Sequence, residues 1–240
     1  YCHLIARKIR ELGVSSDVFP SETPLESLAG ARAIIISGGP HSVYDTESPT
    51  MQKEVLTAGK PVLGICYGHH LISHLLGGEV RKGSKGEFGL AILDLSKSQS
   101  KLLAGVDDAQ QVWMSHRDVV MALPEGFGVT ATTTTCDTAV IEDPARNVYG
   151  VQFHPEVVHS VPGTKVLENF VFNIAGCTKD WNPGQRVALV EEQIRRTVGD
   201  RNVFFFVSGG VDSTVAFTLC LRALGTGRVA GVYVDTGLMR

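Results

Sequence analysis

The first part of the chain alternates between apolar residues at helical spacing and short continuous apolar runs. Apolar residues between Tyr1 and Leu12 recur at the spacing of a helix that Gly13 ends. No N-capping residue precedes this helix, so we expect a strand before it in a longer protein. The elements expected next are a strand over residues 14–19, a turn of helix over 24–29, a buried strand over 33–37, a helix over 47–58 and a buried strand before Cys66. Buried strands separated by helices indicate a parallel sheet covered on both faces.

Beyond residue 78 the pattern changes to many short strands. The last two flank a turn at 144–147 and predict an antiparallel hairpin. A helix over 166–174 is expected to close this part of the fold. The expected strands are 89–95, 111–115, 129–134, 139–142 and 148–153. The whole pattern predicts an α/β fold with a mixed, mostly parallel sheet and an antiparallel hairpin region.

The composition shifts after Gly176, where Trp, Asn, Pro and Gly residues within 177–185 indicate a linker. We therefore expect one domain over residues 1–178 and the start of a second over 179–240. The elements expected in the second are a polar amphipathic helix over 185–198, an all-apolar buried strand over 202–207, a helix that ends near Leu224 and a strand over 229–235. One βαβ unit of this size is too small to be stable alone, so we expect the domain to continue beyond Arg240.

Composition narrows the function classes. The chain has 240 residues, 43% hydrophobic and 20% charged, with a formal net charge of −3. No basic block and no apolar run of transmembrane length are present in the sequence, so neither nucleic acid nor a membrane is an expected partner. The eight histidines show no zinc-binding spacing. Five widely spaced cysteines without a CxxC pair favour a reduced cytosolic setting, and we expect a cytoplasmic protein.

One cysteine stands where a strand turns sharply into a helix. The apolar run from Val62 to Ile65 ends at Cys66, which lies between Gly64 and Gly68. This is the nucleophile-elbow pattern with cysteine in place of serine. A thiol at such a helix N-terminus is favoured as thiolate. The alternative is a buried structural cysteine in a strand that happens to end at glycine.

Two other segments supply partners for that thiol. A loop over residues 37–40 follows a buried strand, so the backbone N–H of Gly39 could join that of Tyr67 in an oxyanion hole, although a plain Gly-Pro turn is the alternative. Because a proline follows His154, the segment is expected to be extended, which places His154 and Glu156 on one face. A carboxylate beside an imidazole orients it as a base; the alternative is a surface turn.

These motifs, in this order and at these separations, resemble the class I glutamine amidotransferase family over about residues 1–178. The resemblance implies that Cys66 attacks the amide of glutamine, that His154 is the acid–base and that Glu156 orients it. It also implies that the N–H groups of Gly39 and Tyr67 bind the oxyanion.

The resemblance further implies which residues hold glutamine. The implied residues are His70, Glu87, His116 and Asp118. Two positions depart from the family pattern, because the family usually has glutamine where His70 stands and glycine where Arg117 stands. Both departures concern the substrate side of the site, so a catalytically impaired regulatory module is an alternative function.

A glycine-rich loop follows the apolar strand of the second domain, at the start of a helix where anions bind readily. It resembles the pyrophosphatase loop of ATP enzymes that adenylate a substrate, while a tight βα turn is the structural alternative. The resemblance implies ATP and Mg²⁺ as cofactors, Asp212 as the residue facing the metal, and adenine against Val234. The residues implied to wrap the phosphates are Ser208, Gly209, Gly210, Val211 and Ser213.

Together the two motif sets indicate a glutamine-hydrolysing enzyme that supplies ammonia to an ATP-dependent amination. A glutaminase serving a different amidation, such as that of another purine or of a tRNA base, is the alternative within the same chemistry. The resemblance also implies a homodimer for a complete enzyme, with the binding site of the aminated substrate mostly outside these residues.

Overall fold

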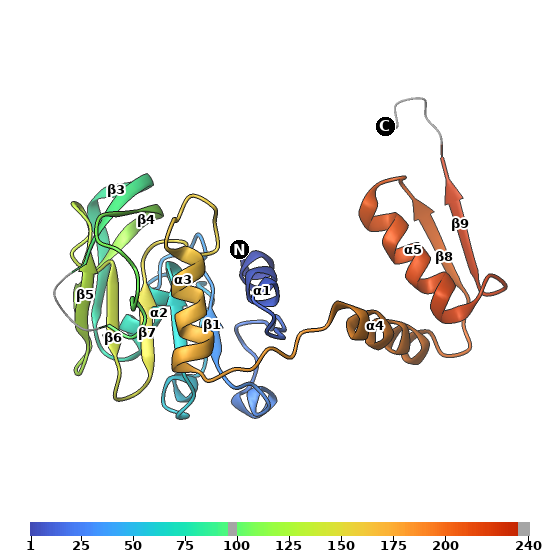
Figure 1. Ribbon diagram of the computed structural model, residues 1–240, viewed down its shortest axis with the longest axis horizontal. Coiled ribbons are helices and arrows are strands. Elements are labelled where there is room, and N and C mark those ends of the chain that lie inside the picture. Colours follow the sequence, from blue (N-terminus) through green and yellow to red (C-terminus); the bar gives the residue numbers. More distant parts are fainter. Residues whose placement is uncertain (96–99, 235–240) are drawn as a thin grey trace. The chain divides into compact units, whose positions relative to one another are not determined.

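The chain divides into two compact units, Tyr1–Asp180 and Trp181–Arg240, called here the N-terminal and C-terminal units. The computed structural model describes residues 1–95 and 100–234. Each unit is built around its own sheet (Figure 1). No helix in the described residues is long and apolar enough to cross a membrane.

A seven-stranded sheet forms the centre of the N-terminal unit, in the order β1-β2-β7-β6-β5-β3-β4. Its strands are β1 (Ile34–Ile36), β2 (Val62–Ile65), β3 (Glu79–Leu95), β4 (Gln110–Ala122), β5 (Gly128–Thr132), β6 (Val140–Asp143) and β7 (Val148–Val151). β1, β2 and β7 are parallel, whereas β7-β6, β6-β5, β5-β3 and β3-β4 are antiparallel pairs. The sheet is therefore mixed as predicted, but among the described strands it is not mostly parallel. The predicted β6-β7 hairpin is confirmed.

Helices cover both faces of the parallel strands, because successive residues of a strand point to opposite sides. Leu63 of β2 packs in one cluster with Ile5 and Leu167, while Val62 packs in another with Ile72. The helical segments are α1 (Cys2–Glu11), η1 (Leu25–Leu28), η2 (Lys53–Leu56), α2 (Tyr67–Leu75), α3 (Gly163–Glu168) and the π-helical η3 (Asn169–Ile174). This double coverage explains why the strand before Cys66 is a continuous apolar run.

Three predicted elements differ from the structure. Residues 14–19 form no strand, because Ser15 bonds instead to the carboxylate of Asp180. The helix predicted over 47–58 is reduced to η2, since Pro49 keeps the preceding residue out of helical geometry and leaves too short a segment.

The helix predicted over 166–174 starts at Gly163 and becomes a π-helix at Asn169. The Asn169 side chain donates to the carbonyls of Leu102 and Ala104.

The C-terminal unit contains α4 (Pro183–Val198), β8 (Val203–Val207), α5 (Val211–Leu224) and β9 (Val229–Tyr233), with β8 and β9 parallel. The predicted βαβ order is present in the described residues, although the last predicted strand position, Asp235, lies outside them. The prediction that this strand is buried is wrong, because residues of β8 alternate between partly buried and exposed. Phe205 packs against Phe217 of α5, whereas Phe204 and Phe206 point to the other face and are exposed. One helix layer covers only one face of the pair.

Candidate active site

Cys66 lies at the turn between β2 and α2 in a strained backbone conformation. Its φ is 52° and its ψ is −103°, a region that non-glycine residues rarely adopt. The turn is fixed from the strand side, where the Cys66 N–H donates to the carbonyl of Val151 on β7 at 2.8 Å. The elbow predicted from the sequence is therefore present as a geometric feature.

The two flanking glycines allow the strand and the helix to approach each other. A Cβ atom on Gly64 would lie 2.4 Å from the carbonyl oxygen of Gly68. A Cβ on Gly68 would lie 2.3 Å from the carbonyl oxygen of Ile36 on β1. Both distances are too short for any side chain, so α2 can start beside β1 and β2 only with glycine at these positions.

His154 and Glu156 follow β7 and are almost fully buried. The Nδ1 atom of His154 lies 2.8 Å from Oε1 of Glu156. The His154 N–H donates to the carbonyl of Trp113 on β4, which fixes the segment against the antiparallel part of the sheet. A Cβ on Gly163 would lie 2.1 Å from the carbonyl oxygen of Pro155, so the start of α3 closes tightly over this segment.

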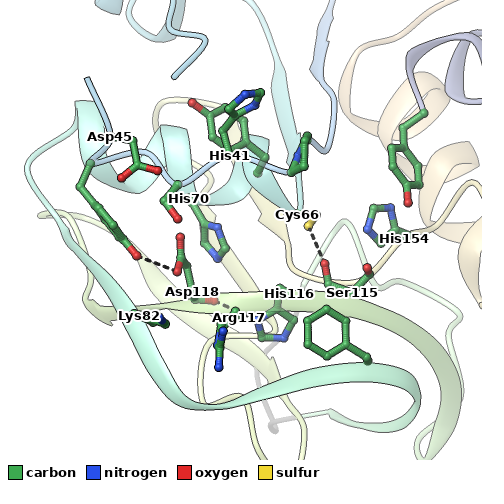
Figure 2. Close-up of a pocket in the computed structure, with 17 residues that line it drawn as sticks. His41, Asp45, Cys66, His70, Lys82, Ser115, His116, Arg117, Asp118 and His154 are labelled. Carbon is green, nitrogen blue, oxygen red and sulfur yellow. Dashed lines mark hydrogen bonds between the residues drawn. The ribbon is translucent and has the colours of Figure 1, made fainter. Parts of the chain in front are cut away.

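The thiol and the imidazole meet beside the loop after β1. A Cβ on Gly38 would lie 3.0 Å from Cε1 of His154 and 3.5 Å from Cβ of Cys66, so both side chains border the same glycine. The Sγ atom of Cys66 lies 3.6 Å from the carbonyl oxygen of Ser115 (Figure 2). The ring of Tyr1 lies 4.9 Å from that of His154, centroid to centroid.

His154 is held in its protonated form at neutral pH. Burial alone would lower the pKa of His154, but hydrogen bonds to Cys66 and Glu156 and attraction to their negative charges outweigh burial and raise this pKa to about 9. An imidazolium next to a sulfur favours thiolate, the nucleophilic form.

The predicted oxyanion donors also lie at this turn. Tyr67 is the first residue of α2, and N–H groups in the first turn of a helix have no acceptor within the helix. A Cβ on Gly39 would lie 3.7 Å from the ring of Tyr67, so the glycine loop passes directly beside α2. The structure thus brings both predicted donors to the cysteine.

A cavity of about 590 Å³ opens in front of Cys66. It is lined on one side by the loop after β1 and on the other by β4 (Figure 2). Its charged or titratable lining residues are Tyr1, His41, Tyr44, Asp45, Cys66, Tyr67, His70, Lys82, His116, Arg117, Asp118 and His154. The volume is that of a typical small-molecule site.

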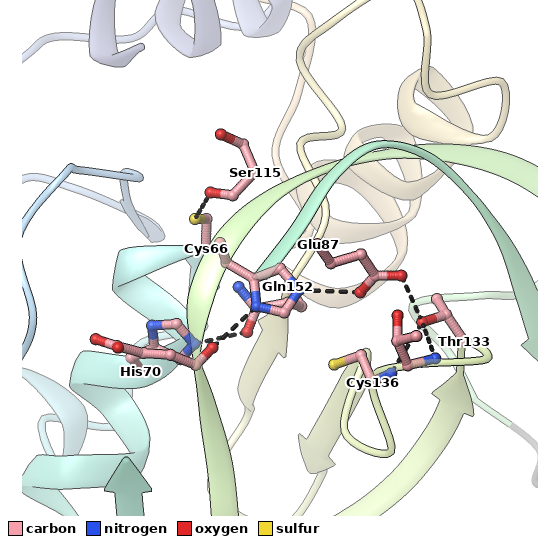
Figure 3. Close-up of polar contacts among 10 residues, drawn as sticks. Cys66, His70, Glu87, Ser115, Thr133, Cys136 and Gln152 are labelled. Carbon is pink, nitrogen blue, oxygen red and sulfur yellow. Dashed lines mark hydrogen bonds and ion pairs between the residues drawn. The ribbon is translucent and has the colours of Figure 1, made fainter. Parts of the chain in front are cut away.

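Glu87 and His116 form a paired unit on adjacent strands, opposite each other in the β3-β4 register. The Nδ1 atom of His116 donates to the carbonyl of Asp118 at 2.9 Å, and its Nε2 lies 3.1 Å from Oε2 of Glu87 (Figure 3). The other Glu87 oxygen accepts from the hydroxyl of Thr133. Both His116 nitrogens therefore face oxygens, which fixes the orientation of the ring. Among the predicted glutamine contacts, Glu87 supports His116.

His70 lines the cavity and is 4% exposed. Burial and repulsion by His116 lower the pKa of His70 to about 4, so the ring is neutral at pH 7. Its Nε2 lies 2.7 Å from Oε1 of Gln152 and donates to it. Arg117 also lines the cavity and is exposed. Both departures from the family pattern therefore line the cavity.

Three lining or supporting residues were missed from the sequence. Ser115 contacts the thiol through its backbone, which no side-chain motif reveals. Gln152 lies two residues before His154, and only the repeated strand face could have indicated it. Tyr44 belongs to an irregular loop and reaches Asp118, a contact without any local pattern.

Glu87, His116 and Cys136 are the one group of metal-ligand side chains found within the described residues. Their ligand atoms lie within 4.8 Å of one another (Figure 3). Burial raises the pKa of the Cys136 thiol to about 11, so it is neutral, and the other two members already bind each other. Both Glu87 oxygens are therefore already occupied, one by His116 and the other by Thr133.

In the C-terminal unit, the six predicted phosphate-loop residues lie together at the start of α5. Gly209 has a φ of +79°, which suits glycine, and Ser208 Oγ lies 3.0 Å from Ser213 Oγ. Asp212 is in the first turn of α5 and is exposed. Val234 directly follows β9 and is also exposed.

The fold and the site define an α/β protein with a thiol on a strained strand–helix turn. The family of class-I glutamine amidotransferases matches residues 1–174, and the chain belongs to this family. Over its whole length the chain is 46% identical to the GMP synthase [glutamine-hydrolyzing] of Symbiobacterium thermophilum and 45% identical to that of Streptomyces coelicolor. It covers 47% and 46% of these proteins, so it spans about half the length of the relatives it matches.

Two solved structures are similar to this chain. A putative GMP synthase subunit from Thermoplasma acidophilum is 28% identical, with a TM-score of 0.66 over 73% of this chain and 88% of that one. A glutamine amidotransferase from Thermotoga maritima is 22% identical, with a TM-score of 0.56 over 82% of this chain and 92% of that one, and shows the fold alone.

The close approach at the elbow generates a first prediction. Gly64→Ala should destabilise the N-terminal unit by about 3 kcal/mol, because its Cβ has no space beside the Gly68 carbonyl. Chemical denaturation of the purified chain measures this. Gly30→Ala is the matched control, since a Cβ there meets nothing within 4 Å. Equal stabilities of the two variants would contradict the packing argument.

A second prediction concerns the protonation of His154. Its imidazole should titrate near pH 9, and Glu156→Gln should lower that pKa by about one to two pH units because an attractive charge is lost. Because the folded-state pKa is raised, the pair's contribution to stability is complete below about pH 6.5 and is lost as the pH rises through 9. NMR titration of the histidine ring protons measures the shift, and an unchanged pKa in the variant would rule out the charge pair as its cause.

Proposed function

We propose that the N-terminal unit hydrolyses glutamine to glutamate and ammonia. The observation that carries this proposal is the strained Cys66 bordering a buried His154–Glu156 pair at the mouth of a small-molecule cavity. Membership of the class-I glutamine amidotransferase family supports glutamine as the substrate.

In the first half of the reaction the thiolate of Cys66 adds to the amide carbon of glutamine. The oxyanion that forms accepts hydrogen bonds from the N–H groups of Gly39 and Tyr67, which are fixed before the substrate arrives. The imidazolium of His154 gives its proton to the departing nitrogen. The C–N bond then breaks, ammonia leaves, and a glutamyl thioester remains on Cys66.

In the second half water attacks the thioester. Neutral His154 takes a proton from this water, and the C–S bond breaks to release glutamate and the Cys66 thiolate. Glu156 is bonded to His154 and acts by orienting it and stabilising its charge. His116 and Asp118 hold the amino-acid end, with Glu87 behind His116 and neutral His70 beside them.

We further propose that the complete enzyme is a GMP synthase, as its relatives are named. The ammonia would convert XMP to GMP while ATP yields AMP and pyrophosphate. We propose binding of XMP and homodimer formation for that complete enzyme. The five cysteines are unpaired, which supports a cytoplasmic setting.

The start of α5 supports the proposal of a nucleotide site. Gly209 at a positive φ and the N–H groups of the first helical turn would together bind an anion, and Ser208 and Ser213 would add hydroxyls. Asp212 is exposed on the same turn and would hold Mg²⁺, which supplies charge neutralisation at the phosphates. The residues that would wrap the β- and γ-phosphates are Ser208, Gly209, Gly210, Val211 and Ser213, with Val234 against adenine.

A second candidate function is an impaired regulatory module. The observation that favours it is the pair of family departures, His70 and Arg117, on the cavity wall. An assay of ammonia release separates the two candidates. A glutaminase serving another ATP-dependent amidation is separated by testing which nucleotide is aminated.

A third prediction tests the nucleophile. Cys66→Ala should abolish ammonia release from glutamine, with a loss of at least about 10³-fold, because no other group forms the thioester. In the complete enzyme, amination with added ammonia should persist. Cys177→Ala is the control, since that thiol lies outside the cavity. Equal loss of both activities in Cys66→Ala would assign the residue a structural role.

A fourth prediction tests the phosphate loop. In the complete enzyme, Asp212→Ala should lower Mg²⁺-dependent AMP formation by about tenfold or more, because the loop loses its metal-facing carboxylate. Hydrolysis of glutamine should change less than about twofold. Asp200→Ala, on the turn before β8, is the matched control. Full ATP turnover by the Asp212→Ala variant at ordinary Mg²⁺ concentrations would show that this loop is not the phosphate-binding loop.

A further inference from the structure

The loop over residues 37–52, between β1 and η2, contains no helix or strand and forms one wall of the cavity. The Tyr67 hydroxyl of α2 donates a hydrogen bond to the carbonyl of Pro49 in this loop. Hydrogen bonds within the loop join residues close in sequence, such as that from the Ser48 hydroxyl to the carbonyl of Ser42. The residues of this loop that line the cavity are Gly39, Pro40, His41, Ser42, Tyr44 and Asp45.

One side chain crosses from this loop to the opposite wall. The hydroxyl of Tyr44 donates to Oδ1 of Asp118 at 2.9 Å (Figure 2). Within the described part of the chain, this is the one hydrogen bond that joins the loop to the β3-β4 hairpin. A hydrogen bond from Ser42 favours the ionised phenol, but burial and the Asp118 carboxylate outweigh it and raise the pKa of Tyr44. The phenol is therefore the donor.

Asp118 is 7% exposed and lines the cavity. Among the described residues no donor reaches its second carboxylate oxygen, so Tyr44 fixes the carboxylate by one oxygen and leaves the other to a cation in the cavity. The Tyr44 side chain itself is 46% exposed, so its hydroxyl is not needed to fill the core.

The spacing between Cys66 and Asp118 suits an amino-acid amide. Ser115 contacts the thiol through its carbonyl, and Asp118, three residues further along β4, lies about 10 Å away along the strand. Glutamine extends about 5 Å from its amide carbon to its ammonium nitrogen. An attack distance of about 3 Å at one end and a hydrogen bond of about 3 Å at the other span the separation.

We propose that Tyr44 is a positioning residue that makes the site selective for a free α-ammonium group. It holds the Asp118 carboxylate toward the cavity and ties the loop over residues 37–52 against β4. Amides of free amino acids are therefore preferred over N-acylated or peptide-bound glutamine. The inference rests on the proposed glutaminase function and adds to it the residue that makes the site select free glutamine over its N-acylated forms.

Binding is measured apart from hydrolysis in the 240-residue chain carrying Cys66→Ser. Adding Tyr44→Phe should weaken binding of L-glutamine about tenfold, the cost of a hydrogen bond to a charged group. Binding of Nα-acetyl-L-glutamine, which lacks the ammonium group, should change less than about twofold. NMR titration measures both affinities. With Cys66 intact, the same substitution should raise KM for glutamine and leave kcat nearly unchanged.

Tyr149→Phe is the matched control, because it removes a buried hydroxyl without a hydrogen-bond partner, outside the cavity. Unchanged affinity for L-glutamine in the Tyr44 variant, or equal loss for both ligands, overturns the inference. A wild-type chain that releases no ammonia, with Tyr44-dependent glutamine binding still present in Cys66→Ser, overturns the proposed function and leaves the inference standing.

Discussion

The contact between two glycine backbones beneath Cys66 is the constraint on which the site depends. With Gly64 and Gly68 in place, α2 starts in contact with β1 and β2, and the chain turns through the φ of 52° at Cys66. The cost of such a conformation, of order 1–3 kcal/mol, is offset by the burial of the apolar strand and the first turns of α2. The thiol is thus fixed by packing before any substrate binds.

Electrostatics separates the histidines around the cavity into different protonation states. His154 borders a thiol and a carboxylate and is positive at neutral pH, whereas His70, buried and bonded to an amide, is neutral. One residue type therefore supplies a positive group beside Cys66 and a neutral group on the cavity wall. The difference arises from neighbours on other strands, because burial alone lowers the pKa of both.

The sequence predicted the elbow, the His154–Glu156 pair and the order of most elements, because each of these depends on residues close together in the chain. The β3-β4 pairing that places Glu87 opposite His116 depends on long-range register, so the sequence implied these residues through family resemblance alone. Pro49 argues against the helix predicted over 47–58, because a proline disfavours helical geometry in the residue before it. The contact between Tyr44 and Asp118 joins an irregular loop to a strand, and no periodicity reports such a contact.

Strand β4 sets the spacing of the whole site. Its backbone carbonyls at Trp113 and Ser115 contact the His154 segment and the Cys66 thiol, while the buried side chains of His116 and Asp118 line the cavity. A slip of one residue in its pairing with β3 would exchange the two faces of the strand. The buried side chains of His116 and Asp118 would then exchange places with those of Ser115 and Arg117, and the contacts of His116 with Glu87 and of Asp118 with Tyr44 would be lost. The register of one hairpin thus determines which side chains the elbow faces across the cavity.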